Sequence, residues 1–324
     1  MTMAHRRAYN GAVLKYAAAA ALFAIASVAA GGSVRADDIP TGPAPFVNVR
    51  LTSGHVALAV WNRPFVRITT EGSMSWRTVG VTLPAAAHMN MWAERTQTRR
   101  GPVGFSQETF VLPPIAGKHR AVLARGAGNV TVLVPQTASL VVVRIFGKGG
   151  IGVNGYQGTL IATTRNGTIL VRDVTGTAFL QALRGRIAVV NSTFDRVRAR
   201  TGAGPIIFSR CNAGQIDATS VIGPVLYDNG TLGQGPVHFA SEYGSVGVGI
   251  ANFSAAPAQS VNGTATTSLG AGGAIVTATS MHGTAVIYHG SIATHPELLT
   301  RWPRLAPFLR RMAPLRRPPA RRIH

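Results

Sequence analysis

Glycine recurs at a regular interval through the centre of this sequence. The interval is nine residues at first and then continues with small slips, at Gly158, Gly167, Gly176, Gly185, Gly204, Gly214, Gly223, Gly235 and Gly244; Asp195 takes the place of a glycine between Gly185 and Gly204. A short segment rich in β-branched and aliphatic residues, the composition typical of strands, follows each of these positions. A repeat with a fixed period restricts the chain to architectures that stack equivalent units.

Ten of these segments carry apolar residues at their second and fourth positions, as in Leu160 with Ala162 and Ile169 with Val171. This period of two predicts strands with one buried face. Strands of about five residues joined by glycine turns predict an all-β, right-handed parallel β-solenoid, with about nine residues in each half-coil. The alternative is an antiparallel sandwich, because Asn166-Gly167 and Asn229-Gly230 also fit hairpin turns.

The sequence divides into four parts. Residues 1–36 have basic residues, an apolar run and small residues before Ala36, which predicts a cleaved secretory signal peptide; the alternative is a retained membrane anchor. Residues 37–127 contain strand-like segments and an irregular, Pro-containing insertion. Residues 128–294 hold the solenoid repeats, and residues 295–324 form a basic tail.

The chain is strongly basic, with 32 Lys and Arg against 11 Asp and Glu and a net charge of +21. Only four of the basic residues lie within residues 1–36, so the exported part stays basic. We therefore expect anionic polysaccharide, lipid headgroups or another envelope protein as partners. Nucleic acid is not expected, because an exported chain does not meet the genome and no recognition module is present.

Several segments resemble a family of exported bacterial adhesin-type proteins with β-strand repeats. The resemblance covers residues 47–250 and rests on Gly54–Leu58, Trp61–Val66, Gly128–Pro135 and Gly158–Gly223. Asn62 stands where the Trp-Asp-Arg pattern of that family has an acidic residue, and residues 162–169 resemble its repeat unit. The resemblance implies a single-stranded parallel β-helix and binding at a surface, and it transfers no catalytic residue.

The sequence shows no catalytic or metal-binding constellation, so we predict no cofactor. Parallel β-helices also carry polysaccharide lyases and glycosidases, which need clustered carboxylates. The carboxylates of the central region are scattered singly, and Asp195 and Asp217 stack as ligands only after a register slip. The lone cysteine, Cys211, is expected to be a small buried residue. A carbohydrate-active envelope enzyme nevertheless remains the alternative function.

Two groups of basic residues are candidates for binding anions. The first is a patch whose central arginines lie on the strand face opposite Val197 and Ala199, with Arg186 expected nearby through parallel stacking. Its members are Arg184, Arg186, Arg196, Arg198, Arg200 and Arg210. The alternative is an ordinary solvated strand face, with Asp195 as a partial partner of the arginines.

The second group lies in the tail, where arginines alternate with apolar residues. Its members are Arg301, Trp302, Arg304, Phe308, Arg310, Arg311, Arg316 and Arg317. One interpretation is an amphipathic helix on an anionic membrane, which would hold a membrane-associated structural protein. The other is a disordered, solubilising tail. The preferred function is a non-enzymatic periplasmic, cell-surface or secreted protein that presents a basic lateral face for adhesion.

Overall fold

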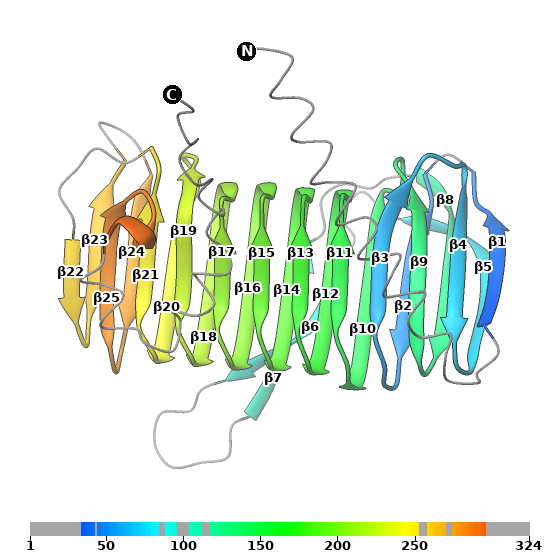
Figure 1. Cartoon of the computed structure of the whole chain (residues 1–324), viewed down its shortest axis with the longest axis horizontal. Helices are drawn as coiled ribbons and strands as arrows, with labels where there is room; N and C mark the ends of the chain where they lie inside the picture. The colour runs from blue at the N-terminus through cyan, green and yellow to red at the C-terminus, as the bar shows by residue number, and fades with distance from the viewer. Residues whose placement is uncertain are drawn as a thin grey trace, which may run out of the picture.

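The computed structural model describes residues 34–42, 44–83, 88–95, 104–111, 117–252, 258–269 and 274–295. Within these ranges the protein is all-β apart from one short 3₁₀ turn, η2 (Ile292–Thr294). Figure 1 shows the strands side by side along one long axis, with β1 and β5 at one end and β22 and β23 at the other. Most of the predicted signal segment and the tail from residue 296 onward lie outside the described residues.

Most of the strands belong to two long faces, which we call sheet A and sheet B. Sheet B runs in spatial order through β5 (Met74–Leu83), β8 (Gly117–Gly126), β2 (Phe46–Leu51), β10 (Leu140–Lys148), β12 (Gln157–Asn166), β14 (Thr175–Arg184), β16 (Thr193–Ala203), β18 (Asn212–Ile222), β20 (Val237–Tyr243), β24 (Ile275–Ser280) and β23 (Thr264–Ser268).

In the central repeats, the strands of sheet A alternate with those of sheet B along the chain. Sheet A runs through β1 (Val34–Pro40), β4 (Phe65–Glu71), β9 (Asn129–Pro135), β3 (Val56–Trp61), β11 (Ile151–Asn154), β13 (Ile169–Arg172), β15 (Ile187–Val190), β17 (Ile206–Ser209), β19 (Val225–Leu232), β21 (Val246–Ile250), β25 (Thr284–His289) and β22 (Ala258–Val261). A separate hairpin pairs β6 (His88–Arg95) with β7 (Gly104–Val111).

The central strands pair in parallel, as the repeat predicted. Leu160 on β12 faces Ala178 on β14, which faces Val197 on β16, so equivalent residues lie 18 and 19 positions apart. Leu160, Ile169, Ile187 and Ile206 are all fully buried and belong to one continuous core between the two sheets. The antiparallel sandwich is therefore wrong for the central repeats, and the chain winds as an all-β solenoid.

Glycine is required at the corner where each sheet B strand turns into sheet A. A Cβ added to Gly185, which has φ +146°, would lie 1.8 Å from the carbonyl oxygen of Gly167 in the neighbouring coil. The same conflict recurs between Gly167 and Gly149 at 1.7 Å, and between Gly204 and Gly185 at 2.1 Å. Every second position of the regular glycine interval therefore reflects backbone stacked directly on backbone at this corner.

Hydroxyl groups close the same corner from the inside. The buried hydroxyls of Thr201, Ser220 and Ser241 donate to the carbonyl oxygens of Gly185, Gly204 and Gly223, at 3.1, 3.0 and 2.8 Å. Each bond joins one coil to the preceding coil and satisfies a hydroxyl that would otherwise be costly to bury. Ala182 occupies the equivalent register position on β14, so the bond is not required in every coil.

Antiparallel strands close both ends of the solenoid. At the first end β4 pairs with β9, β1 pairs with β4, and β5 pairs with β8. At the other end β22 pairs with β25 and β23 pairs with β24. Because an open parallel edge invites pairing with other chains, these strands shield the central repeats from edge-to-edge association.

The order of the first coils does not follow the chain. β2 and β3 lie between β8 and β9 on one side and β10 and β11 on the other, so a coil from early in the sequence is inserted between later ones. The sheets consequently run without interruption across residues 127 and 128, where the sequence predicted the boundary between the N-terminal part and the solenoid repeats. β1 also includes residues 34–36, so cleavage after Ala36 would leave Asp37–Pro40 of that strand.

Part of the outer surface is also buried. Ala188, Ile207 and Leu226 lie outside the core cluster, at the outward positions of β15, β17 and β19, and are 2%, 1% and 0% exposed. Near β19 the cover includes the segment of η2, since the main-chain N–H of Ile292 donates to Asp228 at 2.7 Å. The sides of the solenoid are therefore not uniformly open to solvent.

Candidate functional site

The alternation of β16 determines which of its residues face outward. Val197 and Ala199 point into the core and are 1% and 0% exposed. Arg196, Arg198 and Arg200 occupy the intervening positions, so their side chains share the outer face of sheet B. Residues two apart on a strand are about 6.8 Å apart, which spreads the three guanidinium groups along one line across the face.

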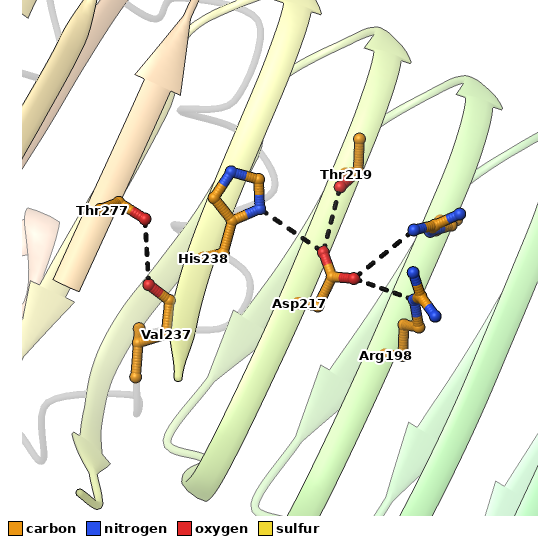
Figure 2. Close-up of polar contacts among 7 residues, drawn as sticks. Arg198, Asp217, Thr219, Val237, His238 and Thr277 are labelled. Atoms are coloured by element: carbon orange, nitrogen blue, oxygen red, sulfur yellow. Dashed lines mark hydrogen bonds and ion pairs between the residues drawn. The ribbon is translucent and has the colours of Figure 1, made fainter. Parts of the chain in front are cut away.

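Asp217 on β18 joins two of these arginines. Its Oδ2 atom lies 2.9 Å from Nε of Arg198 and 3.6 Å from Nη2 of Arg200. Figure 2 shows Asp217 between Arg198 and His238. Its Oδ1 atom lies 3.5 Å from Nδ1 of His238 on β20 and accepts a hydrogen bond from the hydroxyl of Thr219 at 3.3 Å. Parallel pairing places Arg198, Asp217 and His238 in one register row, which creates this cluster from three coils.

The charges around Asp217 determine its protonation. Burial alone would raise the pKa of the Asp217 carboxyl, but the hydrogen bond with His238 and the charges of Arg198 and Arg200 outweigh it and lower the pKa to about 2. The carboxylate is therefore ionised at neutral pH and offsets part of the positive charge. Arg196 is exposed on the same face, beside Gln215 of β18.

The other predicted patch residues lie at the two corners of the coil. Arg184 ends β14, and Arg186 follows in the glycine corner, where the chain enters sheet A. Parallel stacking therefore does not bring Arg186 beside Arg196, Arg198 and Arg200, because β16 pairs with β14 and β18. That expectation is wrong: the corner after Gly185 directs the chain away from sheet B.

Arg210 lies at the opposite corner, between β17 and β18. It has φ +52°, a left-handed conformation shared at equivalent corners by Asp173, Asn191 and Asn229. Its Nε donates to Oδ1 of Asn191 at 2.7 Å. Arg210 thus has a structural contact within its corner and lies five residues before Gln215, the neighbour of Arg196. All eight tail residues predicted to bind anions lie outside the described residues.

Among the described residues, no group of three or more His, Cys, Asp or Glu side chains could hold a metal ion. Cys211 is buried, as the sequence predicted, and burial raises the pKa of its thiol to about 11. An open hollow of about 420 Å³ near β5 and β8 is lined by Thr41, Ala44, Gly80, Val81, Thr82, His119 and Arg120, without a carboxylate. No helix in the described part of the chain could cross a membrane.

The sequence did not predict the pairing of Asp217 with His238. The signal was present as spacing, since Arg198, Asp217 and His238 are separated by 19 and 21 residues, close to one coil. The increase to 21 comes from the extra residues between Leu232 and Val237, which carry two glycines and a proline. A strict count of 18 residues therefore misses the contact.

Comparison with protein families, curated proteins and solved structures found no match to this chain. The resemblance to adhesin-type repeat proteins consequently stays a prediction.

Proposed function

We propose that this protein is an exported, non-enzymatic β-solenoid that binds anionic polysaccharide or lipid headgroups through the outer face of sheet B. The coil is proposed to be right-handed, which the handedness of parallel crossovers favours, with half-coils of about nine residues. The proposed location is the periplasm, the cell surface or the exterior, in agreement with the predicted signal segment. A surface-binding role also agrees with the resemblance to adhesin-type proteins.

The observation that carries the proposal is the outward row of Arg196, Arg198 and Arg200. Arg198, Arg200 and His238 surround the carboxylate of Asp217, and Arg196 adds a third guanidinium group to the same outer face, so basic groups outnumber this carboxylate. Guanidinium groups bind carboxylate, sulfate and phosphate through paired N–H donors. Rigid strands fix the spacing of these donors, which reduces the ordering cost of binding a repetitive anion.

The test is binding of the purified chain, lacking residues 1–36, to immobilised polygalacturonate, heparin and a neutral dextran. The test variant carries Arg196→Ser, Arg198→Ser, Arg200→Ser and Asp217→Asn, because leaving Asp217 without its arginines would destabilise the strand. The control carries Arg63→Ser and Arg120→Ser, which remove the same net charge from exposed positions distant from β16.

We expect the unmodified chain and the control to be retained on both anionic matrices and not on dextran. The test variant should lose at least tenfold in affinity for one of the matrices. Equal weakening of the test variant and the control would mean that net charge alone drives binding, and it would refute a site on β16. Circular dichroism spectra should match among all three proteins.

A further inference from the structure

A second set of arginines lies at one end of sheet B, outside the patch described above. Arg125 on β8 faces Arg50 on β2, and Arg50 faces Arg144 on β10. The three residues come from segments far apart in the sequence and become adjacent only because β2 is inserted between β8 and β10. We call Arg125, Arg50 and Arg144 the arginine ladder.

All three ladder side chains project from the outer face. Their neighbours Ala124, Val49 and Val143 are fully buried in the core, so alternation directs the arginines outward. Adjacent strands are about 4.8 Å apart, so three positive charges follow one another at that interval. Arg125 is exposed, whereas Arg50 and Arg144 are partly buried.

Three polar atoms at the ladder are buried without a hydrogen-bond partner among the described residues. Two of them are the Nε atoms of Arg50 and Arg144. The third is the side-chain oxygen of Asn48, which lies two residues before Arg50 on the same face and is only 9% exposed. Burial, together with the charge of Arg50, lowers the pKa of Arg144. Polar groups in this state favour a ligand that supplies acceptors and negative charge.

The surroundings of the ladder are polar and basic. Ser75 on β5 faces Arg125, and Thr163 on β12 faces Arg144, so hydroxyl-bearing residues flank the ladder at both ends of its row. Arg77, which is exposed, lies in the next row of β5 and faces Leu123. Four arginines and Asn48 therefore surround one area of the surface.

We propose that the arginine ladder binds a phosphate or sulfate monoester group. A tetrahedral oxyanion presents several acceptor oxygens, and guanidinium groups on neighbouring strands can approach different oxygens of one group at the same time. The ligand's negative charge would relieve the repulsion among the stacked arginines. The ladder is three strands from β16 in sheet B, so this site does not depend on the proposed function.

The first experiment measures anion-dependent thermal stability. The melting temperature of the chain lacking residues 1–36 is recorded in chloride, inorganic phosphate and sulfate at equal ionic strength, together with Arg50→Gln, Arg144→Gln and Arg144→Lys. The controls are Arg63→Gln and the β16 variant with four substitutions. We expect phosphate and sulfate to raise the melting temperature of the unmodified chain and both controls above its value in chloride.

In Arg50→Gln and Arg144→Gln this rise should fall to less than half. In Arg144→Lys it should be intermediate, because lysine keeps the charge and loses the paired donors. Each Gln variant should also melt at or above the unmodified chain in chloride, since it removes one of the stacked like charges. Three results would overturn the proposal: the same rise in the Gln variants, no rise in the unmodified chain, or a rise lost only in the β16 variant.

A second experiment separates the two sources of such a group. Binding of the unmodified chain and Arg144→Gln is compared for vesicles of phosphatidylcholine with phosphatidic acid and for a soluble sulfated oligosaccharide. A loss of at least fivefold with Arg144→Gln on vesicles alone assigns a lipid phosphate, and the same loss on the oligosaccharide alone assigns a sulfated glycan. Equal binding by both proteins to both ligands would refute the site.

Discussion

Replacing Gly185 with alanine tests whether stacked glycines hold the coils together. The glycine has φ +146°, and an added Cβ would lie 1.8 Å from the carbonyl oxygen of Gly167 and 2.7 Å from its carbon. Both atoms belong to the backbone of the preceding coil, so neither can rotate away. We expect the coil corner to open, with loss of the hydrogen bond from the N–H of Gly185 to Ala203, now 2.7 Å long.

The expected cost combines two terms. A non-glycine residue in a disfavoured backbone region costs about 1–3 kcal/mol. Forcing an additional methyl group into a packed site costs about 1–3 kcal/mol more. The sum, about 2–6 kcal/mol, is a large fraction of the ~5–15 kcal/mol by which native proteins are usually stable. For a chain of this size each kcal/mol lowers the melting temperature by roughly 2 °C, so we expect a decrease of about 4–12 °C.

Gly155→Ala provides the matched control. Gly155 also has positive φ, +71°, but a Cβ there would meet no atom within 4 Å. Its equivalents at the same corner include Asn191 and Asn229, which shows that side chains fit. Differential scanning calorimetry of both variants separates backbone conformation from stacking. If the melting temperatures of the two variants differ by only roughly 1–2 °C, about the precision of the assay, close contact between coils does not explain the glycine repeat.

Two further predictions concern buried or paired side chains. The pKa of Asp217 is about 2, below its ordinary 3.8, so its contribution to stability is present above pH ~4 and is lost as the pH falls towards 2. Partial exposure limits this contribution to about 1–2 kcal/mol. The decrease in melting temperature between pH 5 and pH 2 should therefore be smaller in Asp217→Asn than in the unmodified chain, by roughly 2–4 °C. An unchanged pH profile would contradict the pairing. Cys211, with its thiol pKa raised to about 11, should react with a maleimide only after denaturation, and rapid labelling of the native chain would contradict its burial.

The sequence predicted the central repeats because one local pattern encodes them. Glycine marks the corners, and alternate apolar residues such as Leu160 and Ile187 define the buried face, so each coil can be recognised from a few residues. The first coils carry no comparable signal. Arg50 meets Arg125 and Arg144 through pairings across 75 and 94 residues, and nothing in residues 46–51 indicates that this strand is inserted between later ones.

The candidate site was predictable to the same extent. Alternation within β16 was sufficient to place Arg196, Arg198 and Arg200 outward, because Val197 and Ala199 had to face the core. The partner of the arginines was misjudged: the ion pairs run to Asp217 in the next coil, whereas Asp195 lies at the register slip between β14 and β16. One inserted residue changes which neighbour each later side chain meets, and a count along the sequence does not show where the strand absorbs it.

The two proposed anion sites meet in one register row because parallel strands stack in register. Arg200 faces Gln181, Gln181 faces Thr163, and Thr163 faces Arg144, so Arg200 lies in the same outward row of sheet B as the ladder. Arg196 and Arg198 lie in other rows. Three strand spacings, about 14 Å, separate Arg144 from Arg200. The row lies along the solenoid axis, perpendicular to the strands. A polyanion extended along that axis could contact both groups at once, whereas one lying along a strand would meet Arg196, Arg198 and Arg200 alone. Because the coils stack along this axis, only a ligand that extends along the axis far enough to span Arg144 and Arg200 gains affinity from the second site.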